Sequence, residues 1–233
     1  MEKKYKEIIR ELKKFSNPNA AKRIAYFGIR SKDKLMGLSI PRMTKIAKEA
    51  GRNHQLAQKL WKSGIHEGKI LAAMVDEIDK VTERQMESWV KDFDSWDVCD
   101  QVCSRLFDKT PYAYKKAFAW SKRKEEFVKR AGFVLMATLS VHDKEASDAK
   151  LMRFFPTIKR ESTDERNYVK KAVNWAIRQI GKRNKNLNKE AIKLSKEIQK
   201  IDSKAARWIT ADALRELKSE AVQKRLSSVR PTK

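Results

Sequence analysis

Ala131-Gly-Phe-Val-Leu-Met-Ala-Thr-Leu-Ser-Val141 is the stretch that decides the fold, because it is apolar on nearly every side. A helix that is hydrophobic all round has to be covered by neighbours on several sides. The stretch lies in the longest part of the chain without Lys, Arg, Asp or Glu, which ends at His142 and is well short of the roughly 20 residues that a membrane span requires. We therefore predict an inner helix of a helical protein and no transmembrane helix.

Helix start signals recur along the rest of the chain. Asn17 before Pro18 is an N-cap followed by proline at the first helical position, and Thr82 with Gln85 predicts a capping box. Seven glycines and five prolines are too few for a many-stranded β fold, and strictly alternating apolar runs are absent. These signals predict an all-α fold of about eleven or twelve helices with no strand.

The spacing of the helices predicts their arrangement. Helix pairs recur at intervals of about 40 residues, which is typical of a right-handed α-α superhelix of HEAT-like hairpins. We expect one domain over residues 1–233, ending in a basic tail at about 225–233 whose order the sequence leaves open. The inner helices of such a stack line a concave face, and a basic concave face fits duplex DNA.

The composition agrees with an anionic partner. The chain has 54 Lys+Arg against 30 Asp+Glu, a formal net charge of +24, and a surface of this kind attracts nucleic acid. The N-terminus, Met1-Glu2-Lys3-Lys4-Tyr5, lacks a signal-peptide core, so we expect a cytoplasmic protein. We expect no membrane contact.

The cysteines and histidines do not suggest a metal site. Cys99 and Cys103 are four residues apart, which allows metal ligation but fits two small buried residues better. The three histidines form no His-x-x-x-His pair. No Gly-rich phosphate loop is present, so we expect neither metal nor cofactor.

An acidic island interrupts the basic chain. Nine carboxylates lie between Asp76 and Asp100, and most such runs are solvated helix faces. If residues 96 to 107 are helical, Asp100 falls at the edge of an apolar arc, one turn after Trp96, whereas Asp97 and Gln101 point further toward solvent. A carboxylate at an apolar rim is partly desolvated and interacts strongly with a nearby cation. Asp100 is therefore the candidate functional carboxylate.

A second tryptophan follows the same pattern. Trp175 lies at the edge of the apolar arc of residues 168–181, beside Lys171 and Arg178. Each tryptophan, taken alone, also fits ordinary packing at a core boundary.

Together these segments resemble the DNA alkylation repair glycosylases of the AlkD type. The resemblance covers about residues 20 to 185 and is carried by Tyr26-Phe27, Leu35–Pro41, Phe93–Cys103, Val128–Ala131 and Val169–Gly181. It implies a curved, all-helical glycosylase that acts as a monomer on duplex DNA, needs no obligate protein partner, and releases N3- and N7-alkylated purines. The residues matching its site are the catalytic set Trp96, Asp100 and Trp175 and the DNA-binding set Tyr26, Arg130, Lys171 and Arg178. Thr138 stands where some members have lysine.

The chemistry implied by the resemblance suits a single carboxylate. An alkylated purine is cationic and leaves as a neutral base, so Asp100 has only to stabilise the developing positive charge on the sugar and to align water. Two alternatives remain open. One is a non-catalytic HEAT-like protein that binds DNA or senses damage, and the other is a helical scaffold for an acidic protein or RNA.

Overall fold

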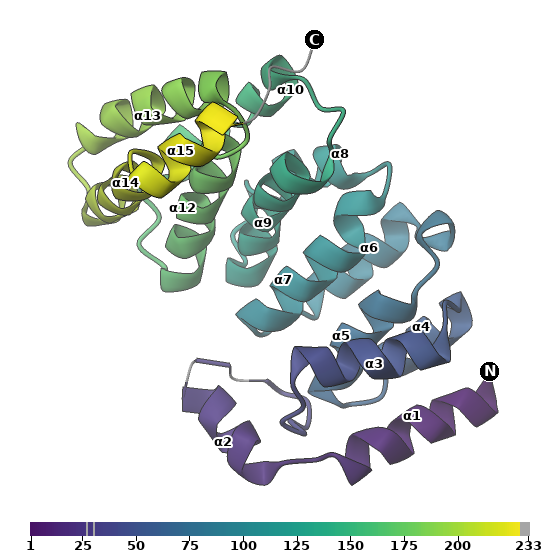
Figure 1. The fold of residues 1–233 in the computed structure, drawn as a ribbon. Coiled ribbons are helices and arrows are strands. Elements are labelled where there is room, and N and C mark those ends of the chain that lie inside the picture. Colours follow the sequence, from purple (N-terminus) through teal and green to yellow (C-terminus); the bar gives the residue numbers. More distant parts are fainter. Residues whose placement is uncertain (27, 30, 229–233) are drawn as a thin grey trace. The chain divides into compact units, whose positions relative to one another are not determined.

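The computed structural model describes residues 1–26, 28–29 and 31–228, and within them the protein is all-helical (Figure 1). These residues form fifteen α-helices and two short 3-10 helices, with one isolated β-bridge between Lys34 and Ile65 and no strand. The predicted all-α class is confirmed. The helices outnumber the predicted eleven or twelve, because short ones such as α10 (Asp148–Met152) and α11 (Phe155–Glu161) are too brief to show a hydrophobic period.

The helices belong to two compact units, Met1–Tyr112 and Ala113–Lys233. The helices of the first unit are α1 (Glu2–Lys14), α2 (Pro18–Tyr26), α3 (Ile40–Ala50), α4 (His54–Trp61), α5 (His66–Val75), η1 (Ile78–Lys80), α6 (Glu83–Lys91), α7 (Trp96–Arg105) and η2 (Phe107–Lys109). Those of the second unit are α8 (Ala113–Trp120), α9 (Glu126–His142), α10, α11, α12 (Asn167–Gly181), α13 (Lys185–Gln199), α14 (Lys204–Leu217) and α15 (Glu220–Ser228). The single domain and the concave face stay predictions.

In the first unit, α5 packs against α3, α4 and α7. Asn17 caps α2 as predicted, since its Oδ1 accepts from the Ala20 N–H at 3.0 Å. Thr82 likewise caps α6 by accepting from the Gln85 N–H. The Gln85 side chain, however, donates to Asp76 at 2.6 Å, so only the first half of the predicted capping box forms.

In the second unit, α9 is the inner helix that its sequence predicts. Every residue from Arg130 to Ser140 is buried, and α8 and α12 pack against it. The contact with α8 is close enough to require glycine at position 132, because a Cβ there would lie 2.4 Å from the Ser121 nitrogen. This helix therefore fixes where α12, with its candidate residues, lies within the unit.

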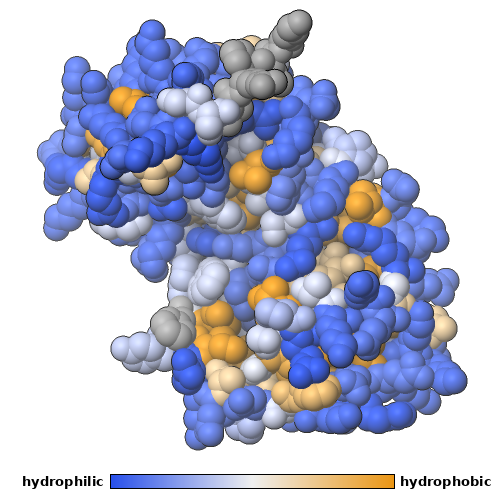
Figure 2. All heavy atoms as spheres, viewed as in Figure 1, coloured by the Kyte–Doolittle hydropathy of each residue, from blue (hydrophilic) through white to orange (hydrophobic). Residues whose placement is uncertain are grey.

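Hydrophilic residues cover most of the face shown in Figure 2, and the apolar residues in view form small groups. The large apolar side chains exposed among the described residues are Met1, Tyr26, Val141 and Trp208. Within the part of the chain that the structure describes, each helix is too short or too polar to span a bilayer.

Candidate functional site

The first candidate pair lies at the start of α7. Trp96 is the first residue of this helix, and Asp100 follows one turn later. Both side chains are partly buried, while Val98, Cys99 and other inner residues of the helix are fully buried. Asp100 thus lies at the edge of the apolar face, where the sequence predicts it.

Asp97 does not point to solvent, contrary to the prediction from helical phase. Its Oδ2 lies 2.7 Å from Nε2 of His66, the first residue of α5. His66 is only 2% exposed, so the carboxylate joins the first turns of two helices below the surface. The phase of α7 is as predicted, but α5 occupies the side that an isolated helix would present to water.

The environment of His66 favours its protonated form. Burial lowers the pKa of His66, but the hydrogen bond to Asp97 and the nearby carboxylate charges raise it by more, so the net shift is upward. Three buried polar atoms here, His66 Nδ1, Asp97 Oδ1 and Ser95 Oγ, have no hydrogen-bond partner among the described residues. Such atoms are rare in folded proteins and cost about 1–3 kcal/mol each.

Other carboxylates of the acidic island also bind groups of the first unit. Their contacts are Asp76 Oδ1 with His54 Nδ1 at 2.7 Å, Asp92 Oδ2 with Trp61 Nε1 at 2.8 Å, and Asp94 Oδ2 with the Lys32 N–H at 2.6 Å. The island is therefore not a simple solvated face, because several of its members organise the fold.

A buried carboxylate outside the island fixes the preceding loop. Glu67 accepts the backbone N–H groups of Met36, Gly37 and Leu38 at 2.6 to 3.2 Å. Gly37 has a positive φ of 79°, and a Cβ there would lie 2.4 Å from the Asn17 carbonyl oxygen. The Leu35–Pro41 segment, one of those that carry the resemblance, is thus anchored to α5.

The second candidate group lies on α12. Lys171, Trp175 and Arg178 are four and three residues apart and share one face of this helix. Lys171 is exposed, whereas Trp175 and Arg178 are partly buried. This group belongs to the second unit, and Trp96 with Asp100 belongs to the first.

Arg178 is engaged by carboxylates of α14. Its Nη1 lies 2.9 Å from Asp212 Oδ2, and its Nε lies 2.5 Å from Glu216 Oε2. Glu216 also binds Lys182 at 2.6 Å. A phosphate would have to compete with these carboxylates for Arg178, whereas the ammonium of Lys171 has no ion pair among the described residues.

Arg130 lies inside the second unit and is only 6% exposed. Its Nη1 donates to the carbonyl oxygen of Tyr168 at 2.7 Å, so the side chain joins α9 to the first turn of α12. This placement suits a structural arginine, and its predicted contact with phosphate stays a prediction.

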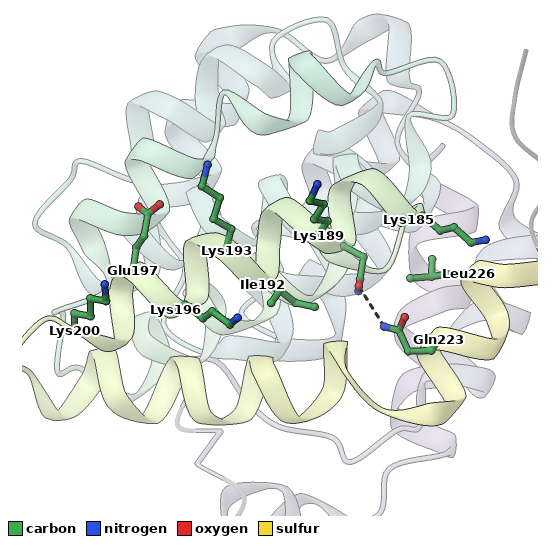
Figure 3. A pocket seen from close by; sticks show the side chains of 10 residues that line it. Lys185, Lys189, Ile192, Lys193, Lys196, Glu197, Lys200, Gln223 and Leu226 are labelled. Carbon is green, nitrogen blue, oxygen red and sulfur yellow. Dashed lines mark hydrogen bonds between the residues drawn. The ribbon is translucent and has the colours of Figure 1, made fainter.

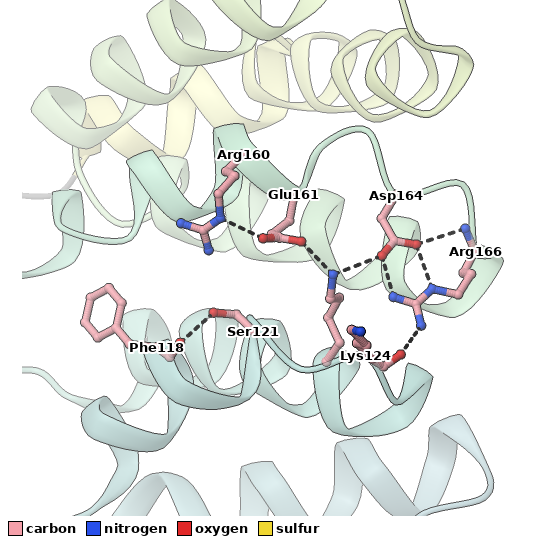
Figure 4. A network of polar contacts seen from close by, with 8 residues as sticks. Phe118, Ser121, Lys124, Arg160, Glu161, Asp164 and Arg166 are labelled. Carbon is pink, nitrogen blue, oxygen red and sulfur yellow. Dashed lines mark hydrogen bonds and ion pairs between the residues drawn. The ribbon is translucent and has the colours of Figure 1, made fainter.

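A polar network fixes the start of α12 (Figure 4). Lys129 on α9 lies 2.6 Å from Glu161 and 3.3 Å from Asp164, and Asp164 pairs with Arg166 at 2.6 Å. Arg166 also donates to the Lys124 carbonyl oxygen at 2.6 Å. These contacts tie the loop before α12 to the start of α9.

Two exposed aromatic residues complete the description. Tyr26, the last residue of α2, is 88% exposed, and the neighbouring Phe27 lies outside the described residues. Trp208 on α14 is 41% exposed, with Lys170 Nζ 5.2 Å from its ring centroid. Sequence analysis missed Trp208, although it falls outside the apolar arc of α14 that is formed by the buried residues Ala205, Ala206, Ile209, Thr210, Ala213 and Leu217.

The described residues contain no group of three or more His, Cys, Asp or Glu side chains arranged to hold a metal ion. Cys99 and Cys103 are both buried, and burial is the main cause that raises the pKa of the Cys103 thiol. A neutral buried thiol is a poor metal ligand and a poor nucleophile.

Residues 8–217 match the family model described as DNA alkylation repair enzyme, and the chain belongs to this family.

Two known proteins are similar over most of the chain. The uncharacterised protein Lin0241 of Listeria innocua serovar 6a (strain ATCC BAA-680 / CLIP 11262) is 24% identical over 200 residues, which cover 84% of this chain and 87% of that protein. A solved structure from a family described as related to the HEAT-like repeat DNA glycosylases, with affinity for branched DNA structures, is 19% identical. It covers 95% of both chains with a TM-score of 0.76, which confirms the HEAT-like fold.

Proposed function

We propose that this protein is a DNA glycosylase that hydrolyses the N-glycosidic bond of cationic N3- and N7-alkylated purines in duplex DNA. The observation that carries the proposal is the pair Trp96 and Asp100, one turn apart at the partly exposed edge of α7 in a member of the DNA alkylation repair enzyme family.

The Asp100 carboxylate supplies the negative charge that this reaction needs beside the sugar. When the glycosidic bond breaks, its electrons go to the cationic purine, which leaves as a neutral base, and positive charge develops on the sugar. Asp100 stabilises that charge electrostatically and orients the water that adds to C1′, while the proton lost by the water passes to solvent. No group is needed to protonate the base, which agrees with a site built around one carboxylate.

The tryptophans and Lys171 hold the substrate in this proposal. The face of Trp96, one turn from Asp100, packs against the deoxyribose and contributes about 0.5–2 kcal/mol toward a cationic sugar. Trp175, on α12 of the second unit, packs against the DNA backbone. Lys171 supplies an exposed ammonium group for a phosphate on the same face of α12 as Trp175. Residues 113–233 carry 31 Lys and Arg against 14 Asp and Glu, so most of the excess positive charge lies in the second unit.

The test is release of free base from a duplex containing a single N7-methylguanine. Wild-type protein is expected to release 7-methylguanine and to leave an abasic site, which alkali then converts into a strand break. Stable binding without any release by the folded protein would contradict the proposed activity.

A second candidate function is binding of DNA without catalysis. It is favoured by the similar solved structure, whose family is described as having affinity for branched DNA. Under this alternative the protein would bind a four-way junction more tightly than a linear duplex of equal length and would release no base from either. Equal affinity for both, together with base release, would exclude it.

A further inference from the structure

Five lysines form a stripe along α13, which we call the α13 lysine stripe. Its members are Lys185, Lys189, Lys193, Lys196 and Lys200 (Figure 3). Because successive members are three or four residues apart, they share one face of the helix. All five side chains are exposed.

The stripe faces away from the interior of the second unit. The opposite face of α13 buries Leu187, Ala191 and Ile198 against α12 and α14. The stripe is on α13, whereas Lys171 and Trp175 are on α12. A ligand held by the stripe need not be the segment of DNA that contacts α12.

None of the five ammonium groups has a hydrogen bond or ion pair among the described residues. Elsewhere in the unit the lysines Lys129 and Lys182 are each paired with a carboxylate at 2.6 Å. Glu197, the carboxylate beside the stripe, is bound by Lys159 from α11 at 2.8 Å. Like charges three or four residues apart destabilise a helix, so the stripe opposes the folding of α13 even though the charge of Glu197 also acts on Lys193 and Lys200.

A groove of about 680 Å³ runs beside the stripe and is bordered by α15. Gln223 on α15 donates to Asn188 Oδ1 at 3.2 Å and joins the two helices (Figure 3). Among the lining residues only Ile192 and Leu226 are apolar. The charged and amide groups of this surface thus offer positive charge and hydrogen bonds, and its lining contains no aromatic residue.

The residue composition of the stripe and its groove indicates which kind of partner binds there. A membrane-binding helix presents large apolar and aromatic side chains to the lipid, and a protein interface is usually enriched in aromatic residues and Arg and depleted in Lys. Neither description fits the stripe. It extends for about 22 Å at 1.5 Å per residue, and over that length a duplex carries about 13 phosphate charges.

We propose that the α13 lysine stripe binds the phosphate backbone of a second DNA segment, apart from the segment that contacts Lys171 and Trp175. The inference rests on the proposed function, because it assumes that the protein binds DNA through α12. One protein molecule would then hold two duplex segments at once.

The experiment asks whether one molecule bridges two duplexes. An undamaged biotinylated duplex is immobilised, the protein is added, and capture of a second, fluorescent duplex is measured, with the protein's mass followed by light scattering. The test variant is Lys189→Gln/Lys193→Gln/Lys196→Gln, since Gln keeps the helix propensity close to that of Lys. The matched control is Lys3→Gln/Lys6→Gln/Lys13→Gln on α1, which removes the same charge from exposed positions.

Monomeric wild-type protein and the α1 control are expected to capture the second duplex. At about 0.15 M salt, the α13 variant should lose roughly 100-fold in affinity for it, because three lost phosphate contacts lower the slope of log K against log salt by about 2.7 in total. The variant should still bind the immobilised duplex and release 7-methylguanine. Several outcomes would overturn the inference: a wild-type protein that never holds two duplexes, equal losses in both variants, or displacement of the second duplex by polyglutamate as effectively as by DNA. A protein that binds no duplex at all would instead refute the proposed function, and the inference with it.

Discussion

His66 Nε2 lies 2.7 Å from Asp97 Oδ2, and this contact joins the first turn of α5 to the first turn of α7, the helix that carries Trp96 and Asp100. The raised pKa of His66 makes the contact an ion pair at the lower end of the physiological pH range. The orientation of the candidate catalytic helix therefore depends on a buried contact that is not itself part of the proposed chemistry.

Asp97→Asn is expected to destabilise the protein in a pH-dependent way. The folded-state pKa of His66 is raised above the unfolded value of about 6.5, so its contribution to stability is fully present below that pH and is lost as pH rises through the raised pKa. The variant should lose about 1–3 kcal/mol near pH 5.5 and less at pH 8.5. Urea unfolding across this range measures the difference, with Asp79→Asn at an exposed position as control. A loss that does not change with pH would mean that the contact between His66 and Asp97 makes no pH-dependent contribution to stability over this range.

Asp100→Asn is expected to reduce base release at least about 100-fold, because it removes charge stabilisation that is realised mainly in the transition state. Unfolding free energy and affinity for undamaged duplex should change little, since Asp100 lies at the rim of the buried face of α7. Single-turnover release of 7-methylguanine measures the effect, and Asp79→Asn again serves as the matched carboxylate control. Near-normal release by the folded variant would remove Asp100 from the mechanism.

Lys171→Gln and Arg178→Gln should have different effects on DNA binding and on stability, although both residues lie on one face of α12. The slope of log K against log salt for duplex binding is expected to fall by about 0.9 when Lys171 is replaced, as for one phosphate contact. Arg178→Gln should change the slope less and lower stability instead, because it leaves Asp212 and Glu216 without their guanidinium partner. Salt titrations and urea unfolding of the two variants separate these effects. A full unit of slope lost with Arg178 would show that phosphate displaces the carboxylates.

Arg130→Gln is expected to lower the stability of the fold and to leave duplex binding unchanged. The guanidinium is buried and donates to the Tyr168 carbonyl oxygen, so its loss should lower the free energy of unfolding by about 1–3 kcal/mol. The slope of log K against log salt for duplex binding should stay within error of the wild-type value. A slope reduced by about 0.9 with unchanged stability would instead support the phosphate contact that the resemblance implies.

The parts of the structure that depend on local spacing could be predicted from the sequence. The apolar run from Ala131 gives an inner helix, and four-residue spacing places Trp96 beside Asp100 on one helix edge. Local spacing does not reveal which neighbour occupies the remaining faces. His66 reaches Asp97 across 31 residues, and Asp212 reaches Arg178 across 34. Both contacts depend on helix packing, so local spacing alone does not show that Asp97 lies against His66 or that Arg178 is paired with Asp212.

The charge of the lesion should decide which bases are released. Cationic 7-methylguanine and 3-methyladenine leave as neutral bases and need help only at the sugar, which a carboxylate such as Asp100 provides. Uracil and hypoxanthine are neutral lesions that leave poorly unless an acid protonates them or the leaving group is stabilised in another way. We therefore expect release of the two methylated purines, little or no release of uracil or hypoxanthine, and full activity in the presence of a metal chelator. Chromatographic analysis of free bases from four otherwise identical duplexes measures all of these outcomes. Efficient uracil release would require a general acid that the proposal does not contain, and loss of activity with chelator would contradict a mechanism carried by Asp100 alone.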